Sequence, residues 1–387
     1  MAFEAMLSAL ESQRGVFALD SERASGFKYS SRAYLVQVSR GHSPLFLIDT
    51  GALNNETEPV LFERFAEILG QEAWILHAAT QDLPCLTELG LNPPALFDTE
   101  LAGRLAGLSR VGLGSMCEAL LGIRLAKEHS AVDWSIRPMK PEWLTYAALD
   151  IEVLPALMDK IEALLREQDK LEFAKQEFSA LVNFRPKPPR VDRWRGVSGT
   201  HDLKDRQKLA IVRELWTARE NLGQKLDVSP GRLIPDAAIH AVAKTTPKSR
   251  SELAGRKDFN GRASRTYLDS WWQAIEKGAN TLDLPPLKLP NHGIPNHKNW
   301  AQKFPDADAR LSAVKPVVQK LSESLSIPVE NLLTPDYLRQ LAWQPPEALT
   351  SDSVAEALMA SGARKWQVDL LAEDLVQALT SVGPSAE

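Results

Sequence analysis

Short hydrophobic segments alternate with amphipathic ones over the first 180 residues. Three segments rich in β-branched and aromatic residues are separated by Gly, Ser and Pro, which predicts an antiparallel meander of strands at 15–20, 33–39 and 45–49. Helical spacing follows at 58–69, and further short strands are predicted at 73–79 and around 95–97. This order predicts a mixed sheet flanked by helices. A single long helix is expected from Pro141 to about Phe178, kinked at Pro155.

Two proline-rich segments divide the rest of the chain. Residues 181–203 and 281–304 carry too many Pro, Gly and charged residues to build a core and are predicted linkers. They delimit an N-terminal domain at 1–180 and two regions with purely helical patterns, at 204–280 and 305–382. Leu-x-Pro-Asp at 233–236 recurs at 333–336, each time before a helix and a later proline. We therefore predict a duplicated helical domain.

The composition and the cysteine content limit the classes of protein to which this chain can belong. The chain is 44% hydrophobic and 25% charged, as folded proteins are, and its longest apolar runs fall short of the roughly 18 residues of a membrane span. The first residues lack a basic segment, so we expect no signal peptide. Cys85 and Cys117 match no zinc spacing, and we expect reduced thiols in a cytoplasmic, monomeric protein with no membrane partner.

Charge is distributed unevenly along the chain. The net charge is −5 overall, but it is −10 over residues 1–180, +11 over 181–303 and −6 over 304–387. A basic middle between acidic flanks predicts contact with a polyanion. A solvated surface whose charges merely segregate remains the alternative.

Carboxylates stand at positions where a sheet would gather them. Asp20 and Glu22 are two residues apart at the end of the first predicted strand, so they face the same way and repel each other unless a cation lies between them. Asp82 follows the strand at 73–79, where it could equally be a metal ligand or the cap of the next helix. Tyr146 and Asp150 share a helix face at i, i+4, as an ordinary surface pair also would.

Together these residues resemble the DEDD exonucleases of the tyrosine subgroup, and most closely the ribonuclease D family. The resemblance lies in LDSER (19–23), HAATQDL (77–83) and DWSIRPMKPEWLTYAALDIEVL (133–154). The helical regions resemble the helicase-and-RNase-D C-terminal (HRDC) domain through LIPDAAIHAVAKTTPKS and LLTPDYLRQLAWQPP. The resemblance implies an α/β ribonuclease-H-like mixed sheet followed by two all-α HRDC domains. The first motif departs from the family, which usually has Thr where Ser21 stands.

This resemblance also implies an activity. The expected enzyme is a 3′→5′ exoribonuclease that trims tRNA precursors and other small RNAs and releases nucleoside 5′-monophosphates. Asp20, Glu22 and Asp150 would hold one divalent cation, Asp20 would bridge to a second one supported by Asp82, and Tyr146 would orient the attacking water. Oxygen ligands favour Mg²⁺ or Mn²⁺.

Basic and aromatic residues outside this set are candidate RNA contacts, because cations bind phosphates and aromatic rings stack on bases. The candidates are Lys127, Arg137, Arg185, Arg193, Trp194, Lys248 and Arg250. Trp216, Trp271 and Trp272 are expected in a core, and His77 as a packed strand residue. Two other functions stay open: a single-stranded DNA 3′→5′ exonuclease, and a catalytically silent RNA-binding module.

Overall fold

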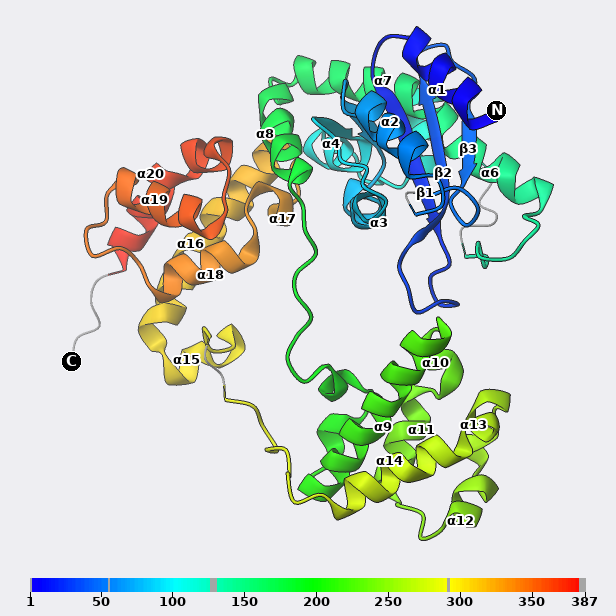
Figure 1. The fold of residues 1–387 in the computed structure, drawn as a ribbon. Helices are drawn as coiled ribbons and strands as arrows, with labels where there is room; N and C mark the ends of the chain where they lie inside the picture. Colours follow the sequence, from blue (N-terminus) through cyan, green and yellow to red (C-terminus); the bar gives the residue numbers. More distant parts are fainter. Residues whose placement is uncertain (1, 55, 126–130, 291–292, 383–387) are drawn as a thin grey trace.

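A five-stranded mixed sheet forms the centre of the N-terminal domain (Figure 1). The computed structural model describes residues 2–54, 56–125, 131–290 and 293–382. Strand order is β3-β2-β1-β4-β5, with bounds β1 (Phe17–Arg23), β2 (Ala33–Arg40), β3 (Phe46–Asp49), β4 (Trp74–Leu76) and β5 (Leu96–Asp98). β1 pairs antiparallel with β2 and parallel with β4, so the predicted meander and mixed sheet are confirmed.

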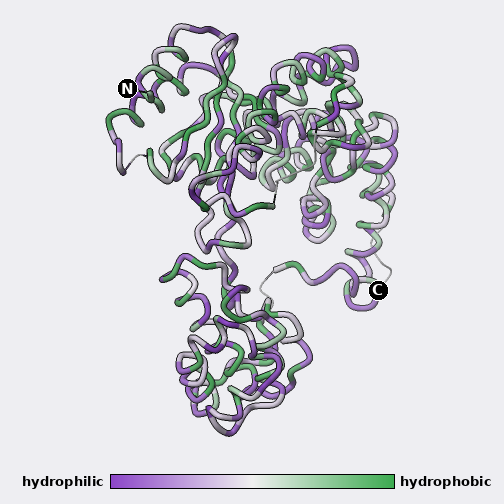
Figure 2. Tube along the Cα trace, turned by 90° about the vertical axis from the view of Figure 1, so that its right-hand side faces the viewer, coloured by the Kyte–Doolittle hydropathy of each residue, from purple (hydrophilic) through white to green (hydrophobic). Residues whose placement is uncertain are grey.

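Helices cover the sheet and bury its apolar side chains. They are α1 (Ala2–Ser12), α2 (Pro59–Leu69), α3 (Leu83–Glu88), α4 (Thr99–Leu105), α5 (Leu113–Leu121), α6 (Pro141–Glu152), α7 (Leu154–Glu167) and α8 (Leu171–Val182). Figure 2 shows the strands as largely hydrophobic stretches, whereas hydrophobic and hydrophilic residues alternate along the helices around them. Each helix therefore buries one face, as its periodicity requires.

The prediction of one long helix over 141–178 was wrong. Three helices, α6, α7 and α8, occupy this stretch. Pro155 lies in the first turn of α7, where its missing N–H costs nothing, and α6 ends just before it. The second break is at Asp169, whose φ of 56° is left-handed and incompatible with a continuing helix.

The first helical domain begins earlier than the sequence indicated. It contains α9 (Arg206–Leu226), α10 (Pro230–Leu233), α11 (Asp236–Lys244), α12 (Arg250–Gly255), α13 (Arg262–Thr266) and α14 (Leu268–Asn280). Trp194, Val197 and Leu203, which belong to the predicted linker, are buried in its core. The segment therefore contributes to a core after all, because its few apolar residues insert between helices.

The second helical region repeats the order of the first. It contains α15 (Trp300–Lys303), α16 (Pro305–Leu325), α17 (Val329–Leu332), α18 (Pro335–Trp343), α19 (Ser351–Ser361) and α20 (Lys365–Ser381). In both regions a helix of 21 residues is followed by one of 4 and one of 9. The long helices end alike, at Asp227 with φ 47° and at Ser326 with φ 52°.

The second helical region shares one buried cluster with the N-terminal domain. Lys170 donates hydrogen bonds to the carbonyls of Leu105 (3.0 Å) and Leu325 (2.5 Å), which lie on the two sides of the interface. Trp366 stacks on Phe173 at 4.6 Å and donates from Nε1 to Glu177 at 2.9 Å.

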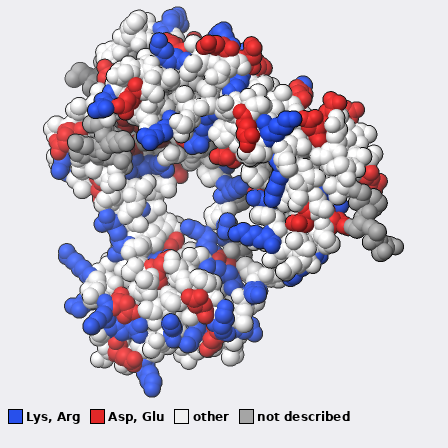
Figure 3. Space-filling view, turned by 180° about the vertical axis from the view of Figure 1, so that it is seen from behind, with Lys and Arg blue, Asp and Glu red and all other residues white. Residues whose placement is uncertain are grey.

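A smaller, polar contact joins the first helical domain to the loop between β1 and β2 and to the start of β2. The Asp227 carboxylate accepts hydrogen bonds from the Ser30 backbone N–H (2.9 Å) and the Tyr34 hydroxyl (3.2 Å). Arg232 donates to the carbonyl of Gly26 at 2.7 Å. Figure 3 shows an opening bounded by the domains, with Lys and Arg side chains at its rim. Among the described residues, no helix is both long and apolar enough to cross a bilayer.

Replacing Lys170 tests the interface between the N-terminal domain and the second helical region. Lys170→Met is expected to cost about 2 kcal/mol, because it leaves one buried and one partly buried carbonyl without their donor. Thermal melting should show a decrease of several degrees. Lys175→Met is the control, since Lys175 only forms an exposed pair with Glu172. Equal melting temperatures for both variants would contradict the role given to Lys170.

Candidate active site

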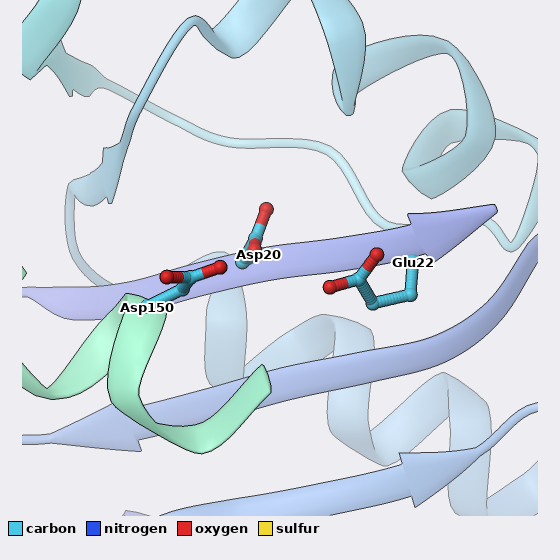
Figure 4. A group of neighbouring side chains, drawn as sticks. All are labelled: Asp20, Glu22 and Asp150. Carbon is cyan, nitrogen blue, oxygen red and sulfur yellow. The ribbon is translucent and has the colours of Figure 1, made fainter. Parts of the chain in front are cut away.

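Three carboxylates converge at the middle strand of the sheet. Asp20 and Glu22 project from β1, which runs on to Arg23, so they lie within the strand and not at its end as predicted. Asp150 reaches them from α6, which packs on β1 (Figure 4). One oxygen from each of the three lies within 4.8 Å of the others. The i, i+2 spacing on a strand and one helix face thus bring together side chains 130 residues apart.

Asp82 lies outside this close triad but lines the same cavity. It precedes α3 and makes no capping hydrogen bond, so the helix-cap reading does not apply. Its buried carboxylate instead accepts a hydrogen bond of 2.6 Å from the Ser21 hydroxyl. Ser21 also lies 3.2 Å from the Cys85 sulfur, which donates to the Asp82 carbonyl at 3.1 Å. The carboxylate and the backbone carbonyl of Asp82 are therefore both held by hydrogen bonds.

Tyr146 stands one helical turn before Asp150 and also lines the cavity. Burial raises the pKa of the Tyr146 phenol, and the nearby Asp150 charge raises it further. The phenol is therefore protonated at neutral pH. It can donate a hydrogen bond, but it cannot remove a proton from water because it already carries its own.

The cavity that contains these groups has a volume of about 640 Å³. Its floor is the carboxylate cluster, and its walls include the start of α5 at Gly112–Ser115 and the side chain of His77. The volume suits a nucleotide-sized ligand. Of the described residues that line it, Arg23 is the only Lys or Arg.

The protein does not neutralise the clustered charge. Burial raises the pKa of Asp20 well above its usual value, and repulsion from Asp82, Glu22 and Asp150 adds to this. Burial also raises the pKa of Glu22 to about 8 and that of Asp150 to about 6. Four acids facing a single arginine need cations to ionise together at neutral pH. Hard oxygen ligands of this kind fit divalent cations.

Several predicted RNA contacts are engaged elsewhere. Trp194 is only 3% exposed, so its ring is in the domain core and cannot stack on a base. Arg137 forms a bidentate ion pair with Asp49, with N–O distances of 2.7 and 2.6 Å, and also donates to the Trp134 carbonyl. Its side chain therefore has a structural role. Lys127 lies outside the described residues.

The other candidates are accessible. Arg185 and Lys248 are exposed, Arg193 lies over the Trp216 ring at 5.6 Å, and Arg250 pairs with Asp269. Trp271 is fully buried, and Trp216 and Trp272 pack against the same core. This confirms the prediction that all three belong to a core.

Sequence reasoning missed how Ser21 and His77 are used. Ser21 was noted only as a departure from the motif, yet it positions Asp82, which lies 61 residues away. His77 is not simply packed, because it lines the cavity. The alternation of side chains on β1 gave no signal for Ser21, since it points away from its two acidic neighbours.

Comparison with known proteins agrees with this geometry. Residues 1–166 match the family described as 3′-5′ exonuclease, and residues 208–275 match the HRDC domain. Ribonuclease D of Granulibacter bethesdensis is 27% identical over 84% of this chain and 80% of its own length. That of Pseudomonas paraeruginosa is 26% identical over 94% and 92%. The chain belongs to the ribonuclease D family. Its N-terminal domain is accordingly a 3′→5′ exonuclease domain of the ribonuclease-H-like class.

Solved structures extend the match over the whole chain. A protein from Bifidobacterium adolescentis superposes with a TM-score of 0.86 at 36% identity, covering 98% of this chain and 95% of that one. Escherichia coli RNase D shares the fold, with a TM-score of 0.67 and 24% identity over 99% and 97%. One HRDC match is found within this ribonuclease D chain. Residues 293–379 match the family described as 3′ to 5′ exonuclease C-terminal domain instead.

Proposed function

We propose that this 3′→5′ exoribonuclease trims the single-stranded 3′ ends of tRNA precursors and other small structured RNAs, releasing nucleoside 5′-monophosphates. The observation that carries the proposal is the triad of Asp20, Glu22 and Asp150, whose uncompensated carboxylates lie on the floor of a nucleotide-sized cavity. Asp20, Glu22 and Asp150 would hold one divalent cation, and Asp20 and Asp82 a second one. Mg²⁺ and Mn²⁺ fit these ligands equally.

Two such cations, when bound, stabilise the attacking and leaving oxygens of an in-line displacement. The rest of the chemistry belongs to the side chains. Tyr146, protonated and beside Asp150, orients a water molecule by donating or accepting a hydrogen bond. Ser21 keeps the Asp82 carboxylate aimed by its 2.6 Å hydrogen bond. Partial burial of the carboxylates reduces their contact with solvent and strengthens electrostatic interactions within the cavity.

The helical domains are the reason for proposing RNA as the substrate. The matched HRDC domain lies in the basic middle of the chain, and the repeated 21-, 4- and 9-residue helices support a second domain of the same type at α16–α20. Lys and Arg side chains around the opening in Figure 3 suit a phosphate backbone. Escherichia coli RNase D, which shares the fold, is an exoribonuclease involved in structured RNA processing, and this substrate class is consistent with the proposal.

Digestion of a 3′-extended tRNA tests the proposal. The purified enzyme with Mg²⁺ or Mn²⁺ should shorten the extension one nucleotide at a time and release 5′-monophosphates, and chelator should stop it. A matched single-stranded DNA should be cut more slowly. Faster cleavage of DNA would favour a DNA exonuclease, and binding of RNA without any cleavage would favour a silent RNA-binding module.

Ser21 offers a test of how Asp82 is positioned. Ser21→Ala is expected to lower kcat about tenfold or more, because partners that orient metal-binding carboxylates contribute about 10- to 100-fold. Ser21→Thr keeps the hydroxyl and should retain most of the activity. Steady-state kinetics on an RNA oligomer with titrated Mn²⁺ would measure both variants. Equal activity of the Ala and Thr variants would show that the hydroxyl is not needed.

A further inference from the structure

His77 lines the same cavity as the catalytic carboxylates, although no step described so far uses it. It follows β4, which pairs in parallel with β1 so that Ile75 is opposite Ala18. Two residues further along each strand stand His77 and Asp20, and both line the active-site cavity. His77 is partly buried and is one of the residues that line the cavity.

One edge of the His77 ring is fixed by a chain of hydrogen bonds. Nδ1 lies 2.8 Å from the hydroxyl of the fully buried Thr99. That hydroxyl donates its single proton to the carbonyl of Leu76 at 3.2 Å. Both contacts are hydrogen bonds only when Nδ1 carries the ring proton and donates it to Thr99. Nε2 is then an unprotonated acceptor.

The ring stays neutral, because burial lowers the pKa of His77 to about 4. The nearby Glu100 raises that pKa only in part and is itself paired with Arg104. Within the described part of the chain, no protein group hydrogen-bonds Nε2. A neutral acceptor repels phosphate oxygens, which are acceptors too, so the group that Nε2 recognises must be a donor.

We infer that His77 accepts, at Nε2, a hydrogen bond from a ribose 2′-hydroxyl beside the scissile phosphate, and so helps the enzyme to distinguish RNA from DNA. The inference rests on the proposed function, because it needs RNA in the cavity. A ribose hydroxyl is a donor that all four nucleotides present at the same place. Base N–H groups differ in position from one nucleotide to the next, so a trimmer of mixed sequences cannot depend on them.

Oligomers with single missing hydroxyls test the inference. Four substrates are compared: all-ribose RNA, and the same RNA lacking the terminal 2′-OH, the terminal 3′-OH or the penultimate 2′-OH. The native enzyme should cut at least one of the two substrates that lack a 2′-OH about threefold to tenfold more slowly than all-ribose RNA, as expected for a neutral hydrogen bond. An effect of His77 confined to the substrate without the 3′-OH would overturn the inference, because DNA carries that hydroxyl too. His77→Phe should cut all-ribose RNA at that lower rate and show no such difference. The position that loses its effect identifies the hydroxyl.

Two matched variants separate recognition from packing. His77→Gln carries an acceptor near the place of Nε2 and should keep part of the discrimination, whereas His77→Asn reaches only Thr99 and should lose it. Thr99→Val removes the partner that fixes the tautomer and should weaken discrimination without contacting RNA. Melting temperatures confirm that each variant is folded.

The outcomes distinguish failure of the inference from failure of the proposed function. The inference is overturned if the native enzyme cuts all four substrates equally, or if His77→Phe slows all four by the same factor, as a packing residue would. Absence of metal-dependent cleavage of RNA by the native enzyme would instead refute the proposed function. In that case the same oligomers made of DNA show which polymer is cut.

Discussion

Asp20→Asn is expected to lower kcat/KM on RNA by at least about 10³-fold. Burial raises the pKa of Asp20 well above its usual value, and the charges of Asp82, Glu22 and Asp150 all raise it further. Replacing it removes a charged ligand common to both proposed cations. Cations at such sites supply several kcal/mol of stabilisation to the transition state, and each 1.36 kcal/mol is tenfold in rate. Asp150→Asn, which removes another member of the same triad, should behave in the same way.

The control for this experiment is Glu152→Gln. Glu152 lies on α6 two residues after Asp150, is exposed and does not line the cavity. Release of 5′-monophosphates from a labelled RNA measures activity, and fluorescence anisotropy measures binding. Both Asn variants should still bind RNA, since the accessible basic residues lie elsewhere. Activity within tenfold of the native enzyme in either Asn variant would refute the assignment of the site.

The sequence predicted the parts of the site that depend on local periodicity. Asp20 and Glu22 share a face because side chains alternate on a strand, and Tyr146 and Asp150 share one because a helix has 3.6 residues per turn. The order of β1, β2 and β3 follows from the same rules. These features need only a few neighbouring residues to be specified.

Contacts between distant segments could not be predicted in this way. Trp194 stands among prolines and arginines, but burial between helices outweighs its polar surroundings. Arg137 appeared free until Asp49, 88 residues away, was brought next to it. The hydrogen bond from Ser21 to Asp82 likewise depends on the fold, which brings the residue before α3 next to β1. In each case tertiary packing determines the role of a side chain, and the local sequence alone does not specify that role.

Glu22→Gln is expected to raise the melting temperature of the metal-free enzyme at pH 8 by several degrees. In the folded state burial raises the pKa of Glu22 to about 8 from an ordinary value of 4.5. A carboxyl with a raised pKa stabilises the fold fully below the unfolded value, and this contribution is lost as the pH rises from about 4.5 to about 8. Ionised Glu22 thus costs about 2 kcal/mol at pH 8, allowing for solvent in the open cavity.

The pH and metal dependence of this difference distinguish it from simple repacking. Melting curves in chelator should show the Gln variant and the native enzyme close together at pH 5, and separated by about 4–8 °C at pH 8. Saturating Mn²⁺ should reverse the order, because cations at 100 times their dissociation constant stabilise the native site by about 2.7 kcal/mol. Glu152→Gln should follow the native enzyme throughout. A Glu22→Gln advantage that is equal at both pH values, or unaffected by Mn²⁺, would mean that charge repulsion at a cation site is not its cause.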